Sequence, residues 1–154
     1  MTIYFLTLVL LSLLDASSGC SCSDASNKEI FCNAHWVGLL KIISKSLSED
    51  NQTLEYRVGI VKMFKSSNFS LTNGVRIPLE TSASAGTCGL DFLKTKTVYL
   101  LLGKVDGRVL KTSLCGQLHL DEWKSVPKQI KHELKTRAYE PCDGSGKKVV
   151  ASVP

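Results

Sequence analysis

Residues 97–115 of this 154-residue chain read TVYLLLGKVDGRVLKTSLC and carry the clearest signals of its fold class. Residues 97–105 form the most apolar of the predicted strands, so we expect this strand to lie centrally in a sheet. Asp106-Gly107 is a strong hairpin signal, because both residue types accept the positive φ angles of a two-residue turn. The chain returns through residues 108–114, and Cys115 closes the segment. The stretch therefore predicts a β-hairpin that ends in a cysteine.

Three earlier segments also have the composition of strands. They are residues 36–44, 54–64 and 75–79. Apolar residues alternate along the second of these segments and then change phase beside Gly59, which predicts a β-bulge. A bulge bends a strand, as the closure of a barrel requires. Asn73-Gly74 is a turn signal ahead of the third segment.

The C-terminal part of the chain changes from strand to helix periodicity. Apolar residues recur every four positions, as on one face of a helix: Val126, Ile130, Leu134 and Ala138. We expect Ser125 to cap the helix, Pro127 to lie near its first turn, and Pro141 to end it. About five short strands with one C-terminal amphipathic helix predict a mainly β fold, a five-stranded closed or partly open barrel of the oligonucleotide-binding (OB) type.

The N-terminus has the layout of a secretory signal peptide. Residues 3–14 are almost wholly apolar, and about 12 residues is too short for a bilayer, which needs roughly 20. Small residues follow at 16–19, as a cleavage site requires, although no Lys or Arg precedes the apolar run. We expect cleavage after Gly19, with a cut after Ser18 as the alternative. The mature chain would then begin at Cys20 and be secreted to the extracellular space.

All 6 cysteines fall after residue 19: Cys20, Cys22, Cys32, Cys88, Cys115 and Cys142. An even count in a secreted chain predicts three disulfides, and six cysteines allow 15 pairings that spacing alone does not resolve. A zinc site is disfavoured, because Cys20-Ser21-Cys22 lacks the two-residue gap of a zinc knuckle. Two triplets predict N-glycosylation in surface loops, at Asn51 and at Asn68.

Other features bear on the class of function. The three histidines, His35, His119 and His132, lack the spacing of metal ligands, so the chain is predicted not to be an enzyme. Its formal net charge is +5, and basic residues gather near the C-terminus: Lys124, Lys128, Lys131, Lys135, Arg137, Lys147 and Lys148. This patch is either a solvated helix face or a contact for sulfated glycans. An extracellular location and the lack of an aromatic stacking platform argue against nucleic-acid binding.

Several motifs together identify a resemblance to a known family. They are Cys20-Ser21-Cys22, Phe31-Cys32-Asn33, Cys88-Gly89, the hairpin at 103–115, Trp123 and Cys142. The set resembles the N-terminal, netrin-like domain of the tissue inhibitors of metalloproteinases over residues 20–142, which leaves 143–154 as a flexible tail. The resemblance implies the pairs Cys20–Cys88, Cys22–Cys115 and Cys32–Cys142. Two-domain members carry six more cysteines downstream, so we expect a one-domain, monomeric form without a cofactor of its own.

The resemblance also implies a mechanism. The first residue of the mature chain offers an α-amino nitrogen and a carbonyl oxygen, which can chelate the open position of a catalytic zinc. Cys20 would bind the zinc of a matrix-type or related metalloproteinase, and Ser21 would enter the primed-side pocket. The expected protease contacts are Cys20, Ser21, Cys22, Ser23, Asp24, Gly86, Thr87 and Cys88. The alternative is a non-inhibitory, extracellular netrin-like binding module, in which Cys20 is only structural.

Overall fold

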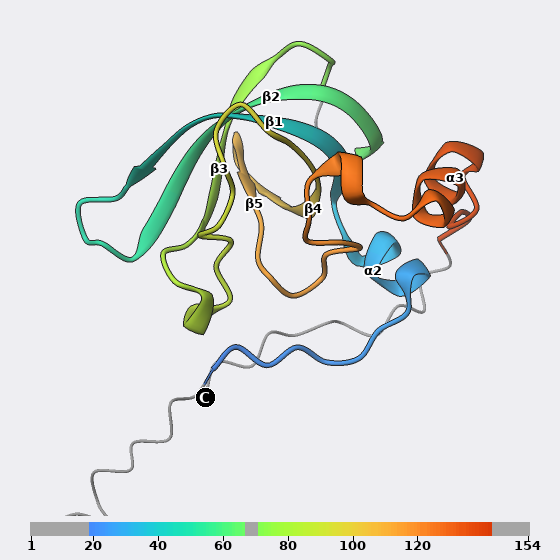
Figure 1. Ribbon diagram of the computed structural model, residues 1–154, viewed down its shortest axis with the longest axis horizontal. Helices are drawn as coiled ribbons and strands as arrows, with labels where there is room; N and C mark the ends of the chain where they lie inside the picture. The colour runs from blue at the N-terminus through green and yellow to red at the C-terminus, as the bar shows by residue number, and fades with distance from the viewer. Residues whose placement is uncertain (1–18, 67–70, 143–154) are drawn as a thin grey trace, which may run out of the picture.

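The computed structural model describes residues 19–66 and 71–142, and within them it shows a closed barrel with the strand order β1-β2-β3-β5-β4 (Figure 1). The elements are α2 (Asn27–Asn33), β1 (Trp36–Leu47), β2 (Thr53–Ser66), β3 (Arg76–Ser82), η1 (Ala85–Thr87), β4 (Val98–Asp106), β5 (Val109–Lys111), η2 (Trp123–Ser125) and α3 (Lys128–Thr136). The predicted mainly β, five-stranded barrel with a C-terminal helix is confirmed. The predicted signal peptide up to residue 18, the tail at 143–154 and Asn68 lie outside the described residues.

Antiparallel pairing joins β1 to β2 and β4, β2 to β3, and β4 to β5. The barrel closes through a short parallel pairing of β3 with β5, in which Leu79 lies opposite Leu110. The β5 strand is shorter than the predicted return strand at 108–114, because the chain turns away after Lys111. The Thr112 amide donates to the Glu80 carbonyl, and the Leu114 amide donates to the carbonyl of Cys88.

The predicted bulge lies just beyond Gly59. Leu39 pairs with Lys62 and Leu40 pairs with Ile60, so Val61 is the extra residue of β2. The register shifts again on the opposite strand, where Ile43 is the extra residue between Ile42 and Ser44. Such bulges increase strand twist and allow β1 and β2 to curve around the barrel.

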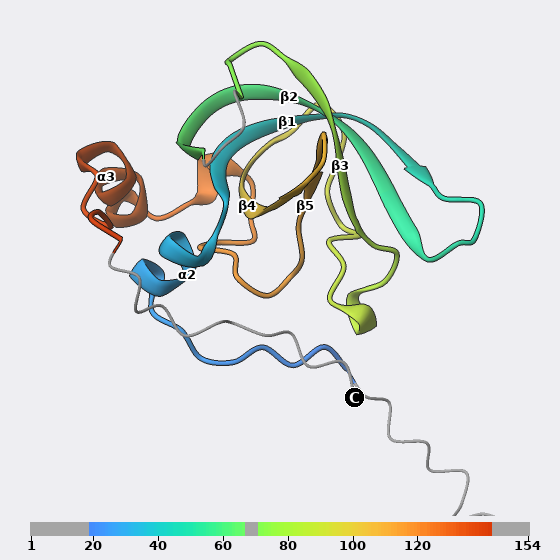
Figure 2. The same ribbon diagram turned by 180° about the vertical axis from the view of Figure 1, so that it is seen from behind.

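Two groups of buried side chains hold the fold together. The first fills the barrel and includes Trp36, Tyr56 and Leu101. The second lies on the outer face of β1 and β4, where Leu39 and Leu100 pack with side chains of the helical segments. Both helices therefore lie at one end of the barrel, away from the projecting β1–β2 hairpin, as Figure 2 shows. Within the described residues, no helix is long and apolar enough to span a membrane.

The helix boundaries differ from those predicted. Ser125 lies in η2 and does not cap α3, which starts at Lys128 after Pro127. The helix ends at Thr136, because Arg137 adopts a left-handed backbone with φ 59°, so Pro141 does not end it. Val126, Ile130 and Leu134 are buried as expected, but Ala138 is exposed and Tyr139 takes the buried position. The left-handed residue turns the chain and brings the next side chain inward.

Candidate functional site

Two disulfides fix the N-terminal segment to the barrel. Cys20 is bonded to Cys88 and Cys22 to Cys115, with Cα–Cα distances of 5.0 and 5.3 Å. The two bonds lie against each other, because the Cys115 sulfur is 3.6 Å from that of Cys20 and 3.9 Å from that of Cys88. A third bond joins Cys32 to Cys142, so these are the three pairs that the family resemblance implies. The clustered sulfurs of Cys20, Cys88 and Cys115 are all in disulfides and offer no thiolate to a metal.

The backbone around these bonds forms an exposed ridge. Ser21, Cys22, Ser23 and Asp24 are exposed, and Cys20 is half-buried over its disulfide. Gly19 is also exposed, and a Cβ placed on it would meet no atom within 4 Å. The ridge is therefore exposed at Gly19 and from Ser21 to Asp24, while disulfides tie Cys20 and Cys22 to the barrel. In Figure 1 it is the blue segment below the barrel, next to the short η1 turn.

The η1 turn forms a second exposed segment beside the ridge. Ser84 caps it, with its hydroxyl accepting from the Thr87 amide at 3.4 Å and its carbonyl accepting from the Thr87 hydroxyl at 3.0 Å. Cys88 follows in a left-handed conformation with φ 62°, and its amide donates to the Ala85 carbonyl. Residues 84–87 are exposed, whereas Cys88 is buried. The predicted contacts Gly86 and Thr87 are thus joined to Cys20 through the Cys20–Cys88 bond.

Buried polar contacts hold this turn against the barrel. The Leu90 amide donates to the Thr81 hydroxyl at 3.1 Å, and the Tyr56 hydroxyl donates to the Leu90 carbonyl at 2.7 Å. Burial raises the pKa of Tyr56 to about 12, so its hydroxyl stays protonated and donates at neutral pH. Gly89 is also required here, since a Cβ on it would lie 2.0 Å from the Ser82 carbonyl oxygen. Of these residues, Gly89 belongs to the Cys88-Gly89 motif that the sequence singled out, whereas the contacts of Tyr56, Thr81 and Leu90 were not predicted.

The other end of the ridge is held by α2. Ser26 and Glu29 form a capping box, in which the Ser26 amide donates to the Glu29 carboxylate at 2.8 Å and the Glu29 amide donates to the Ser26 hydroxyl at 3.3 Å. The Lys65 ammonium donates to the carbonyls of Phe31 and Cys32 at 2.9 and 2.8 Å. Burial lowers the pKa of Lys65, and Glu140 opposes that shift. The Ser-x-x-Glu spacing is the sequence signal of such a helix start, and α2 was not among the predicted elements.

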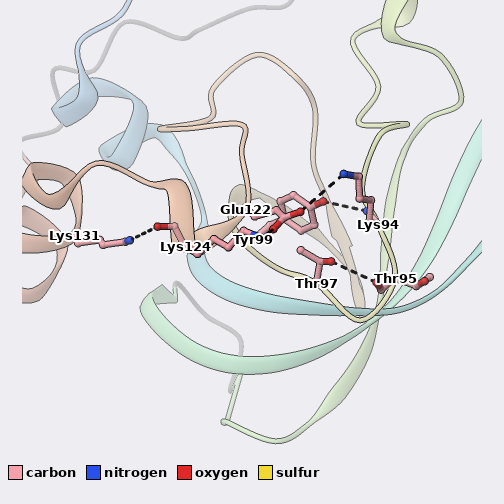
Figure 3. Close-up of polar contacts among 7 residues, drawn as sticks. All are labelled: Lys94, Thr95, Thr97, Tyr99, Glu122, Lys124 and Lys131. Carbon is pink, nitrogen blue, oxygen red and sulfur yellow. Dashed lines mark hydrogen bonds and ion pairs between the residues drawn. The ribbon is translucent and has the colours of Figure 1, made fainter.

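The remaining predicted residues lie elsewhere. Asn51 is exposed in the β1–β2 hairpin with φ 59°, as an accessible glycosylation acceptor would be. Within the basic C-terminal patch, Lys124 pairs with Glu122 at 2.7 Å, and Lys131 donates to the Lys124 carbonyl at 3.1 Å (Figure 3). Arg137 pairs with Glu140. Several of the patch cations are therefore engaged within the protein.

The comparisons with known proteins agree with this geometry. Residues 18–151 match the family model of the tissue inhibitors of metalloproteinase. The chain belongs to this family. The family consists of inhibitors and not of enzymes, so this family member is not an enzyme. The family also accounts for the netrin-like barrel and its disulfides.

Curated relatives come from invertebrates and vertebrates. The chain is 36% identical to "Putative metalloproteinase inhibitor tag-225" of Caenorhabditis elegans, over 85% of this chain and 95% of the relative. It is 30% identical to Metalloproteinase inhibitor 3 of Xenopus laevis, over 82% of this chain and 61% of the relative. It is 27% identical to human Metalloproteinase inhibitor 2, over 88% of this chain and 63% of the relative. The family member thus spans nearly all of the nematode relative but only part of these two vertebrate relatives.

Proposed function

We propose that this chain is a secreted, monomeric inhibitor that blocks the active site of matrix-type or related zinc metalloproteinases. The observation that carries the proposal is the ridge from Cys20 to Asp24, which is exposed beyond the half-buried Cys20 and is held by two disulfides. A free chain end loses conformational entropy when it binds. A ridge fixed in advance loses less, so more of the contact energy contributes to affinity.

The chemistry of a first residue suits a zinc ion. Cleavage before Cys20 would place an α-amino nitrogen and a carbonyl oxygen on one backbone unit, which could together occupy the open position of a catalytic zinc. Metal binding requires the deprotonated amine. An α-amino group has an ordinary pKa of about 7.7–8.0, so deprotonation near pH 7 costs much less than it would for a lysine side chain, whose pKa is about 10.4.

The neighbouring residues would supply the remaining contacts. Ser21 is exposed directly after Cys20 and would enter the primed-side pocket, with Ser23 and Asp24 continuing along the cleft. The η1 turn, with Gly86 and Thr87, would contact the non-primed side, because the Cys20–Cys88 bond keeps it next to the ridge. These side chains are small, so we expect the main chain of the ridge to contribute much of the binding energy.

The test is titration of the secreted protein, with Cys20 verified as its first residue, against an active-site-quantified matrix metalloproteinase. We expect stoichiometric inhibition, lost when the α-amine is acetylated and lost equally in a form that retains Gly19. Both changes convert the amine to an amide and leave the disulfides intact. Full inhibition by the form that begins at Gly19 would refute chelation. No inhibition by the form that begins at Cys20 would instead favour the non-inhibitory binding module.

Contact with sulfated glycans is a second and separate proposal. It rests on Lys128 and Lys135, which are exposed on α3 and make no ion pair with another described residue. Heparin chromatography of a Lys128→Gln, Lys135→Gln double variant tests it. We expect elution at lower salt than the parent protein, because fewer cations would contact sulfates. Elution at the same salt would remove α3 as the glycan contact.

A further inference from the structure

A hollow of about 480 Å³ lies on the outer surface of β1 and β2, bounded by the segments that lead into β3 and β4. Its lining includes the apolar side chains Ile43 and Val61 and the cations Lys41, Arg76 and Lys96. In Figure 1, β1 and β2 pass over the top of the barrel, whereas the N-terminal ridge and η1 lie below it. The hollow is therefore remote from the proposed protease contact.

Two of the three register shifts between β1 and β2 contribute apolar side chains to this hollow. Ile43 and Val61 are the extra residues of β1 and β2, and their side chains are 37% and 46% exposed. In a regular strand, successive side chains alternate between the inward and the outward face. The extra residue at each bulge interrupts this alternation. Gly59 adds depth, because it has no side chain and a Cβ on it would already lie 3.6 Å from the Ile43 Cδ1 atom. Two branched apolar side chains thus border a shallow depression.

The rim of the hollow is positively charged and uncompensated. None of the described residues that line it is acidic, and Lys41, Arg76 and Lys96 make no ion pair with another described residue. Lys94 and Lys124 differ from these cations, since both pair with Glu122 (Figure 3).

The main chain that carries one of these cations is held against β1. Lys96 has φ 64°, a conformation in which glycine and asparagine are favoured. Its amide donates to the Ile42 carbonyl at 2.7 Å, which holds the Lys96 backbone against β1.

We propose that this hollow docks an acidic, amphipathic peptide segment of a second protein. A large apolar side chain would lie against Ile43 and Val61, and flanking carboxylates would pair with the cations of the rim. A sulfated glycan satisfies the charge but has no apolar group for the hollow. A membrane surface would be contacted by protruding apolar side chains and not by a depression. The site is remote from the ridge, so partner and protease could be bound together.

The direct test is NMR titration of the ¹⁵N-labelled mature protein with an acetylated, amidated peptide of four glutamates around one leucine. We expect the largest shifts at the amides of Lys41, Gly59, Val61 and Gly74, the residues of the hollow. The same peptide with serine replacing leucine should bind at least about fivefold more weakly, because it buries less apolar surface. Absence of shifts at the hollow with about 2 mM leucine peptide would overturn the proposal, and so would equal binding of the two peptides.

Two variants locate the contact. Gly59→Val fills the hollow and suits a strand, because β-branched residues favour strands and the new Cβ makes only an ordinary contact. Lys96→Asn removes a charge while retaining a residue type that accepts positive φ. We expect binding of the leucine peptide to weaken about tenfold with Gly59→Val and about threefold with Lys96→Asn, while Lys135→Gln on α3 changes nothing.

The spectrum and thermal unfolding of each variant show whether the fold is retained. Undiminished peptide binding to a folded Gly59→Val protein would refute the site. A heparin octasaccharide or phosphatidylserine vesicles that shift the same amides more strongly than the leucine peptide would assign the hollow to a glycan or a membrane and would refute a peptide partner.

Discussion

Two glycines near Cys88 have different surroundings, and the difference can be tested. A Cβ on Gly89 would lie 2.0 Å from the Ser82 carbonyl oxygen, whereas a Cβ on Gly86 would find its nearest neighbour, the Ser84 hydroxyl, at 3.7 Å. Backbone cannot move aside as a flexible side chain can. We therefore expect Gly89→Ala to lower the free energy of unfolding by about 1–3 kcal/mol, the usual cost of overpacking. Urea denaturation of the oxidised protein measures this.

The control for this prediction is Gly86→Ala. It should change the free energy of unfolding by less than about 0.5 kcal/mol, as is usual for an exposed position. Equal stability of the two variants would show that the segment after Cys88 can shift and that Gly89 does not fix the turn.

Tyr56 connects the inside of the barrel to the segment that carries Cys88. Its hydroxyl donates to the Leu90 carbonyl at 2.7 Å, and the ring is 1% exposed. Tyr56→Phe keeps the ring but leaves that carbonyl without its donor, so we expect a loss of about 1–3 kcal/mol in unfolding free energy. Amide hydrogen exchange should also accelerate at Leu90. Tyr99→Phe is a comparison, because its hydroxyl accepts from the amide of Lys94 instead. Unchanged stability of Tyr56→Phe would mean that water replaces the lost donor.

At the scale of single residues, the sequence predicts which chemical groups a site contains better than it predicts which residues surround them. The six cysteines and the small residues of the ridge could be placed from their order and their family resemblance. Tyr56 and Thr81 could not, because any buried strand can contain such residues. Their contact with Leu90 depends on bringing together β2, β3 and the loop after η1. A hydrogen bond between residues 34 positions apart leaves no local pattern in the sequence.

Among the elements, strands with regular alternation were predicted well and helix ends were not. The repeat at Val126, Ile130 and Leu134 correctly indicated a buried face. It starts before the helix, at Val126, which directly follows η2 and lies two residues ahead of Lys128. Periodicity could not separate the two elements, and Ser125 therefore resembled an N-cap. The left-handed turn at Arg137 has no glycine to mark it.

Lys65 makes the position of α2 depend on β2. Its ammonium donates to the carbonyls of Phe31 and Cys32 and lies 5.3 Å from the Phe31 ring centre. Lys65→Met keeps a similar apolar stem but removes both donors, so we expect the free energy of unfolding to fall by about 1–3 kcal/mol. Chemical denaturation measures the change. Lys62→Met is the matched control on the same strand, since Lys62 is exposed and makes no hydrogen bond to another described residue, although it lies over Phe64. An equal effect of the two changes would show that losing surface charge, and not the helix contact, matters.

At the scale of the whole molecule, long-range connections define the fold. The barrel closes through the parallel pairing of β3 with β5, which are not consecutive in the chain. Strands that are consecutive in the chain tend to pair with each other, as antiparallel hairpins do. The disulfides join residues 68, 93 and 110 positions apart. Spacing alone left 15 pairings open, because loop entropy changes slowly with loop length. The family resemblance implied one of them, and the same pairing is present in the structure.

Two of these disulfides allow stability to be separated from inhibition. Cys22–Cys115 and Cys32–Cys142 close loops of similar length, 93 and 110 residues apart, so removing either should cost about 4–5 kcal/mol in the chain-entropy model. Their positions differ, since the first holds the ridge and the second joins α2 to the segment after α3.

We expect the Cys32→Ser, Cys142→Ser protein to unfold at a lower temperature yet still titrate a metalloproteinase stoichiometrically at 25 °C. The Cys22→Ser, Cys115→Ser protein should be destabilised to a similar extent and inhibit at least about tenfold more weakly, because its ridge is no longer fixed. Circular dichroism must show both proteins folded at the assay temperature. Equal inhibition by the two would contradict the proposal that a rigid N-terminal ridge makes this chain an inhibitor.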